Sequence, residues 1–137
     1  MPRSVALLLR DGYTTVEAEV RAALTAAGYS DLLPWHFQVL RNLGDDGARP
    51  VELAAKASIT RQAVAKIVDE LERIGIVYRD PDPDDGRGVI IRYTDRGLAM
   101  LAVARQRMTD LEHEYAARLG PQHWTTVRSG LDALFGE

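Results

Sequence analysis

Between residues 50 and 75 the apolar positions follow a helical period and predict two short helices joined by a tight turn. The first begins at Pro50, a residue type favoured at the first helical position. In the second, apolar side chains recur at spacings of three and four, which is typical of one buried face. Thr60 stands at the N-cap and Gly75 at a left-handed stop, so the segment indicates a helix-turn-helix. The apolar positions of the second helix are Val64, Ile67, Val68, Leu71 and Ile74.

A hairpin is predicted directly after the second helix. Residues 76–79 and 89–93 are rich in β-branched side chains and indicate two short strands. Residues 80–88 hold two prolines and two glycines, so we expect them to form a long, polar and irregular tip. A helix-turn-helix followed by a hairpin is a winged helix. We assign this winged helix-turn-helix to residues 32–95, with an additional helix over residues 32–43.

Amphipathic patterns on both sides predict further helices at 4–27, 96–119 and 122–135. The expected order is α-α-α-α-β-β-α-α, so the fold class is mainly α. The outer helices carry apolar stripes that one small winged helix would leave in water, a loss of roughly 25 cal/mol per Å² of apolar area. A second copy of the chain would cover them, since two-fold dimers are the commonest closed assembly. Residues 4–27 and 96–135 are therefore the predicted dimerisation region of a single chain, 1–137.

Composition narrows the classes of protein that remain. A hydrophobic share of 46% with 27% charged residues is typical of a folded domain, and 137 residues fit one such domain. The net charge of −3 argues against a protein that coats nucleic acid by bulk charge, but not against local basic groups. With no cysteine, no disulfide or thiol switch can form, which fits a reducing cytosol. Because no apolar run approaches the length of a membrane span, we expect a cytoplasmic protein that binds no membrane.

Candidate metal and catalytic motifs are incomplete. Asp80, Asp82 and Asp84 imitate the start of a calcium loop, but the glycine and the glutamate that such a loop needs further on are absent. The histidines are scattered along the chain, and no phosphate-binding glycine loop or nucleophile elbow is present. We therefore expect no metal, no cofactor and no enzymatic activity.

The most specific motifs lie in five segments, which are Leu53–Ala57, Thr60–Gly75, Val77–Arg79, Asp82–Arg87 and Tyr93–Gly97. An acidic wing that ends in arginine precedes a Thr-x-x-Gly helix start. Together they resemble the MarR (multiple antibiotic resistance regulator) family. Gly86 stands where the family often has a second arginine, and Tyr93 where it has leucine. The resemblance implies a DNA-binding regulator whose helix 60–74 enters the major groove and whose Arg87 enters the minor groove.

The residues exposed at the start of the second helix suit base recognition. Arg61 can bind guanine through two hydrogen bonds, Gln62 can bind adenine, and Ala63 can contact a thymine methyl group. Arg79 and the hydroxyls near the turn are candidate phosphate ligands, although helix capping alone explains Thr60. Solvated surface charge is the alternative explanation for the cations. The candidate DNA-binding residues are Ser58, Thr60, Arg61, Gln62, Ala63, Lys66, Arg79 and Arg87.

Arg87 has acidic neighbours in the wing. We expect Asp85 to support it by holding its guanidinium in a bidentate pair. The remaining wing carboxylates would repel phosphates unless they point away or pair within the protein. Affinity for DNA depends on the phosphates that are neutralised, so we expect moderate affinity with a marked dependence on salt.

Regulators of the resembled family often bind small aromatic effectors. Tyr13, Trp35 and His36 are candidate walls of such a site, with ordinary core packing as the alternative. We expect a homodimeric transcriptional repressor, released by a small molecule, on a near-palindromic site in double-stranded DNA whose half-sites lie about one helical turn apart. The alternative is a winged-helix module that binds proteins without binding DNA. A docking face would more often show aromatic side chains than Arg61 and Gln62.

Overall fold

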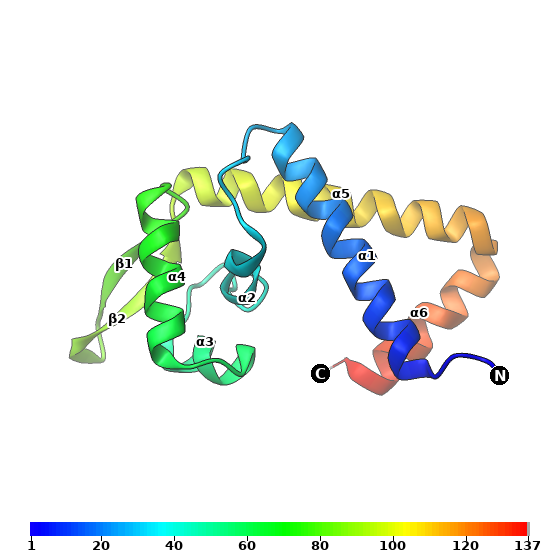
Figure 1. The fold of residues 1–137 in the computed structure, drawn as a ribbon, viewed down its shortest axis with the longest axis horizontal. Coiled ribbons are helices and arrows are strands. Elements are labelled where there is room, and N and C mark those ends of the chain that lie inside the picture. The colour runs from blue at the N-terminus through cyan, green and yellow to red at the C-terminus, as the bar shows by residue number, and fades with distance from the viewer. Residues whose placement is uncertain (137) are drawn as a thin grey trace. The chain divides into compact units, whose positions relative to one another are not determined.

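The computed structural model describes residues 1–136 and divides into two compact units. Residues 24–103 form one unit, and residues 1–23 with those from 104 onward form the other. Two helices, α1 (Val5–Ala26) and α5 (Asp95–Leu119), contribute residues to both units. The order of elements confirms the predicted succession and the mainly α fold class (Figure 1). The other elements are η1 (Pro34–His36), α2 (Phe37–Leu40), α3 (Pro50–Ala57), α4 (Arg61–Arg73), β1 (Val77–Asp82), β2 (Asp85–Tyr93) and α6 (Pro121–Phe135).

The helix-turn-helix of α3 and α4 forms as predicted. Thr60 Oγ1 accepts a hydrogen bond from the Ala63 N–H at 3.0 Å and caps α4, and Gly75 ends this segment with a φ of 80°. Ser58 ends α3 in the left-handed conformation, which turns the chain tightly into α4. The stripe of α4 is buried at Val64, Ile67, Val68 and Leu71 and half-buried at Ile74.

The predicted helix at 32–43 is shorter than expected. Its helical part begins at Pro34, which follows the extended Leu33, and consists of one 3-10 turn and the single α turn of α2. Arg41 N–H donates to Phe37 O and Asn42 N–H to Val39 O, so the last turn is of mixed type and the helix stops there. The apolar side chains nevertheless pack as predicted: Phe37, Leu40 and Leu43 are buried. The prediction was right about the core positions and wrong about the length.

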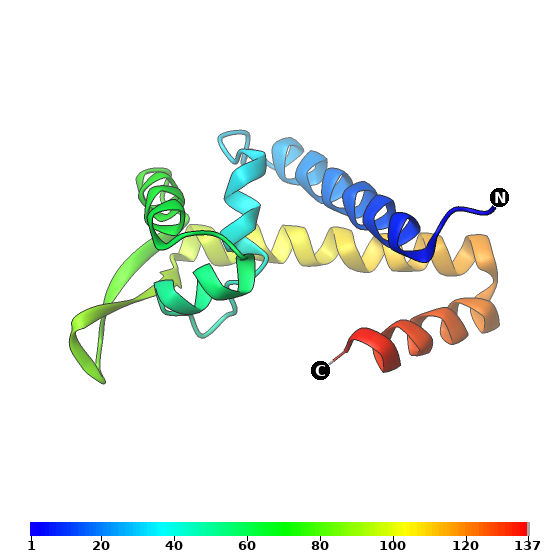
Figure 2. The same ribbon diagram turned by 60° about the horizontal axis from the view of Figure 1, so that its bottom comes forward.

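The two strands of the hairpin formed by β1 and β2, called the wing below, are longer than predicted. The expectation of an irregular tip over residues 80–88 is wrong, because β1 extends to Asp82 and β2 begins at Asp85 (Figure 2). The sheet has only two strands, so Pro81, opposite Val89, lies on an edge strand, where proline is tolerated. The register shifts between Pro81 and Asp82, next to the turn. The wing is therefore a paired ribbon almost to its end.

The wing joins α5 through a close backbone contact. Thr94 Oγ1 accepts a hydrogen bond from the Gly97 N–H at 3.0 Å and so caps the start of α5. A Cβ at Gly97 would overlap the carbonyl group of Ile76, so only glycine fits there. Tyr93 is buried and its hydroxyl donates to the Leu43 carbonyl at 3.0 Å. The departure from leucine at this position thus adds a hydrogen bond between the wing and the segment after α2.

In the other unit the chain reverses at Gly120, whose φ is 88°. Arg107 of α5 bonds Glu19 of α1 and Glu114, and the Tyr115 and Trp124 rings lie 5.8 Å apart. None of the described residues of α6 is buried. Large apolar side chains are exposed on both terminal helices, including Leu8, Leu9, Val127, Leu131, Leu134 and Phe135. Within residues 1–136, no helix has the length and apolar character to span a bilayer.

Candidate nucleic-acid interface

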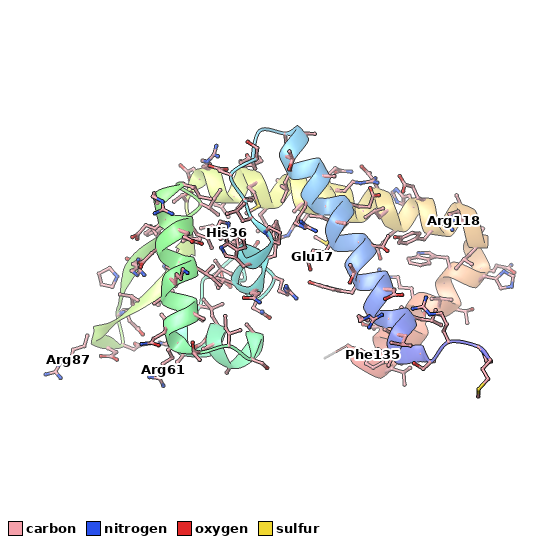
Figure 3. All side chains as sticks on the ribbon, in the orientation of Figure 1. Glu17, His36, Arg61, Arg87, Arg118 and Phe135 are labelled. Atoms are coloured by element: carbon pink, nitrogen blue, oxygen red, sulfur yellow. The ribbon has the colours of Figure 1, made fainter. Side chains whose placement is uncertain are left out.

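The first turn of α4 presents the residues predicted to read bases. Arg61, Gln62 and Lys66 are exposed, and Ala63 is half-buried. The side chain of Arg61 extends from the N-terminal end of α4 (Figure 3). In the described part of the chain its guanidinium has no carboxylate partner. The buried stripe thus fixes α4 on the core while its first turn stays free to meet a ligand.

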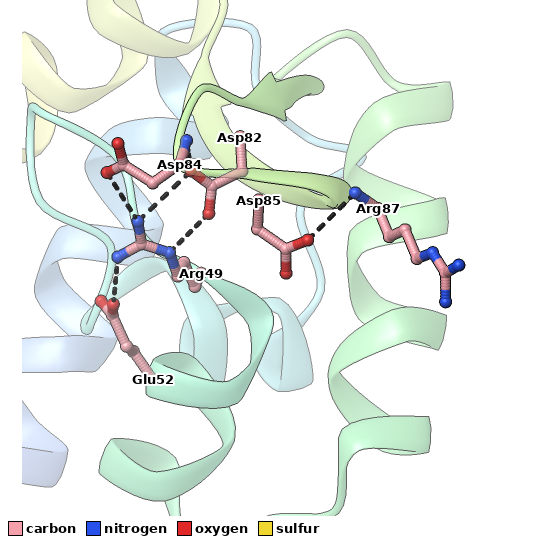
Figure 4. A network of polar contacts seen from close by, with 6 residues as sticks. All are labelled: Arg49, Glu52, Asp82, Asp84, Asp85 and Arg87. Atoms are coloured by element: carbon pink, nitrogen blue, oxygen red, sulfur yellow. Dashed lines mark hydrogen bonds and ion pairs between the residues drawn. The ribbon is translucent and has the colours of Figure 1, made fainter.

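The wing tip presents Arg87 in a way that differs from the expectation. Asp85 Oδ1 accepts a hydrogen bond from the backbone N–H of Arg87 at 3.1 Å, and the expected pair with the guanidinium does not form. The reason is local: the turn at 83–84 places the Asp85 carboxylate under the backbone, and the Arg87 side chain points outward (Figure 4). Asp85 therefore shapes the tip and leaves the charge of Arg87 exposed.

Two other arginines of this unit are occupied by internal partners. Arg79, a candidate phosphate ligand, bonds Asp69 at 2.7 Å and Glu72 at 3.0 Å. Arg92 bonds Asp80 at 2.8 Å and also donates to a backbone carbonyl. These contacts favour a bracing role for Arg79 between α4 and β1. Of the candidate hydroxyls, that of Thr60 is already the acceptor of the helix cap.

Sequence reasoning missed Arg49, which stands just before α3 and contacts the wing. Its Nε donates to Asp82 Oδ2 at 2.6 Å, and the same guanidinium lies 3.3 Å from Glu52 and 3.5 Å from Asp84 (Figure 4). The hydrogen bond from Arg49, and then that from the Asp84 N–H, hold the pKa of the Asp82 carboxyl below its ordinary value. No local pattern signals this pair, because 33 residues separate its members.

A second missed residue, Glu70 of α4, connects two of the three candidate effector residues. Trp35 Nε1 donates to Glu70 Oε2 at 2.8 Å, and His36 Nε2 lies 2.9 Å from the same oxygen. Since His36 Nδ1 accepts from the Leu33 N–H, the ring proton sits on Nε2 and is donated to Glu70. His36 is buried, a position that favours packing, the alternative left open by the sequence. Tyr13 belongs to the other unit.

A shallow hollow of about 390 Å³ lies beside this cluster. Trp35 and Glu70 line it together with three residues of α4, namely Ala63, Lys66 and Ile67. Trp35 is 45% exposed, so its ring is open to a ligand on this side. Among the described residues, no group of three or more metal-ligating side chains lies together.

The Glu70 contacts predict a pH-dependent contribution to stability. The hydrogen bonds from Trp35, and then from His36, hold the pKa of Glu70 below its ordinary value of 4.5. The folded state thus binds this proton less tightly than the unfolded chain, so the stabilisation is complete above the unfolded pKa and is lost as the pH falls through the folded one. Glu70→Gln should lower the melting temperature at pH 7, and the difference from the unmodified protein should shrink toward pH 4.

Thermal melts followed by circular dichroism across this pH range test the Glu70 prediction. Asp132→Asn, on the exposed surface of α6, is the matched control and should change the melting temperature little at any pH. An equal loss from Glu70→Gln at pH 7 and pH 4 would contradict the assigned role of the carboxylate.

Comparisons with known proteins agree with this arrangement. A sequence model of the MarR family matches residues 30–88. The chain is 35% identical over 114 residues to an HTH-type transcriptional repressor of Mycobacterium tuberculosis, an alignment that covers 82% of this chain and 79% of that protein. It is 33% identical over 99 residues to the multiple antibiotic resistance protein MarR of Salmonella typhimurium, covering 71% and 69%. The crystal structure of the reduced form of MarR from E. coli aligns over 98% of both chains with a TM-score of 0.80 at 24% identity, which shows the fold.

Proposed function

The chain belongs to the MarR family, and on this basis we propose that it is a DNA-binding transcriptional repressor that acts as a homodimer on a near-palindromic site. Relatives of this chain are named transcriptional regulators and repressors, and proteins of the family bind DNA as dimers. Such regulators act by occupying DNA, with no catalytic step. We place the protein in the cytoplasm, where a bacterial-type regulator meets its DNA.

The observation that carries this proposal is the division between free and paired cations. Arg61 on α4 and Arg87 on the wing have no carboxylate partner in the described chain, whereas Arg79 and Arg92 are paired. These two cations thus stand at the two places where a winged helix meets the major and minor grooves, while Arg73, which also lacks a carboxylate partner among the described residues, lies in the last turn of α4. In the proposed complex Arg61 and Gln62 bind base edges. Lys66 contacts phosphates, and Arg87 enters the minor groove. Ser58 and Thr60 remain proposed phosphate donors.

Dimerisation is proposed to run through residues 4–27 and 96–135. Support comes from the exposed apolar side chains of α1 and α6, which a monomer would leave in water. A two-fold dimer would set its recognition helices about one turn of DNA apart, which predicts an inverted repeat as the preferred sequence.

Control by a small aromatic effector is proposed at the hollow beside Trp35. The exposed ring offers a stacking surface, and Lys66 adjacent to it suits a ligand with a carboxylate or phenolate group. A ligand there would displace α4 from the geometry that fits DNA and shift the dimer population toward a state that binds poorly. A docking module for proteins is the second candidate, but the exposed face of α4 carries Arg61, Gln62 and Lys66 in place of apolar anchors.

The dependence of DNA binding on salt tests the proposed interface. Three exposed cations in each of two protomers, Arg61, Lys66 and Arg87, give about six cationic contacts, so the affinity should fall by about a thousandfold between 50 and 200 mM salt. Fluorescence anisotropy with a duplex enriched from a random pool measures this slope. The docking alternative requires no such slope, and a response that stays flat across this range would contradict the proposed function.

A further inference from the structure

The wing carries its DNA-facing arginine among several carboxylates. Asp80, Asp82 and Asp84 lie within the same hairpin as Arg87. Left unpaired, these charges would repel the phosphates of any DNA that Arg87 approaches. The way the structure neutralises them therefore determines how well the wing can bind.

The Arg49 side chain neutralises two of these carboxylates from outside the wing. All three nitrogens of its guanidinium have partners: Nε and one terminal nitrogen contact Asp82 at 2.6 and 3.3 Å, and the other contacts Glu52 at 3.3 Å. The nitrogen shared with Asp82 also lies 3.5 Å from Asp84. A two-point contact of this kind fixes orientation as well as charge. The hydrogen bond to Asp82 raises the pKa of Arg49 above its ordinary value, so the pair stays charged.

The carboxylate that Arg49 binds lies at a structurally sensitive position. The Asp82 side chain is 2% exposed, and its Oδ1 also accepts from the Asp84 N–H at 3.0 Å, which shapes the turn at the wing tip. On the other strand, Ala48 exchanges two backbone hydrogen bonds with Ile91 of β2, at 2.8 and 3.0 Å. The segment before α3 therefore contacts both strands of the wing, and the contact nearest the tip of the wing is made by Arg49.

We propose that Arg49 is a positioning residue for DNA binding: it ties the start of α3 to Asp82, orients the wing so that Arg87 meets the minor groove, and does not itself contact DNA. This inference rests on the proposed function. With this contact, α3 and the wing form one body, so the spacing between the first turn of α4 and Arg87 is fixed before DNA is bound. A fixed spacing reduces the free energy needed to order the interface on binding.

A double-mutant cycle separates positioning from direct contact. In the unmodified protein, Arg87→Ala should weaken binding to the selected duplex by about tenfold or more. In the Arg49→Gln background the same change should weaken it by less than about twofold, because Arg87 is already misplaced. The slope of the logarithm of the binding constant against the logarithm of the salt concentration should fall by about one per protomer in total when both changes are made. Hydroxyl-radical protection at the minor groove should be lost in either single variant.

Two further variants keep the cycle decisive. Arg49→Lys retains one ion pair with Asp82 and should restore part of the Arg87 effect. Arg118→Gln removes an exposed cation of α5 and should leave the cycle unchanged. If Arg49→Gln unfolds, as circular dichroism would reveal, the same cycle is run with Arg49→Lys, which should still reduce the Arg87 effect in part.

The outcomes distinguish this inference from the function on which it rests. Additive losses from Arg49→Gln and Arg87→Ala, with one unit of salt slope lost for each, would show that Arg49 binds phosphate directly and would overturn the inference alone. Failure of the unmodified protein to bind any duplex would overturn the proposed function instead.

Discussion

Arg61→Ala is expected to weaken binding to the selected duplex by about 1–3 kcal/mol and to relax the preference for one base pair in each half-site. Arg61 is the exposed cation in the first turn of α4, and alanine keeps the helix while removing the bidentate donor. The double variant Arg61→Ala with Arg87→Ala removes both cations from each protomer of the dimer. It should therefore show no specific binding at micromolar concentrations.

The matched control for Arg61 is Arg73→Ala, in the last turn of the same helix. Arg73 is exposed and the same charge is lost, but the first turn of α4 is untouched. Affinity should therefore change little, and sequence preference should not change. Anisotropy titrations with the selected duplex and with single-base variants of it provide both quantities. Retention of full specificity by the double variant would show that bases are read elsewhere.

The second large effect is expected from the dimer surface. Leu131→Asp places a charge on the exposed apolar side of α6, where Leu131 and Leu134 are 40% and 75% exposed in the chain described. If this surface packs against a second copy, the aspartate is desolvated without a partner and the dimer dissociates. A monomer holds only one half-site, so the affinity for the full duplex should fall by about 10²–10⁴-fold.

Sedimentation velocity at micromolar concentration measures the change of oligomeric state directly. Ser129→Asp adds the same charge two residues away, off the apolar stripe of α6, and should leave both the dimer and DNA binding intact. A Leu131→Asp protein that remains dimeric would place the interface outside this stripe of α6.

The local parts of the fold were predictable because their determinants lie within one or two helical turns. The stripe of α4, the Thr60 cap and the Gly75 stop each depend on residues at most four positions apart, and all three form as predicted. The helix at 32–43 was overestimated because Phe37 and Leu43 share one buried face even where the backbone between them leaves the α conformation.

The wing and the polar network were less predictable because they depend on pairing between distant segments. Prolines and glycines indicated an irregular tip, but strand pairing carries β1 through Pro81 to Asp82. The contacts of Arg49 with Asp82 and of Trp35 with Glu70 join residues 33 and 35 positions apart, so no motif signals them. The sequence indicated Asp85 as support for Arg87, but it did not indicate that the Asp85 carboxylate accepts from the backbone N–H of Arg87.

Selection of bound duplexes from a random DNA pool measures directly whether a dimer of this protein recognises one DNA sequence. We expect enrichment of an inverted repeat whose half-sites lie about one helical turn apart, and loss of that enrichment with Arg61→Ala. Recovery of DNA without any shared sequence, from a protein that is folded and in low salt, would contradict this expectation.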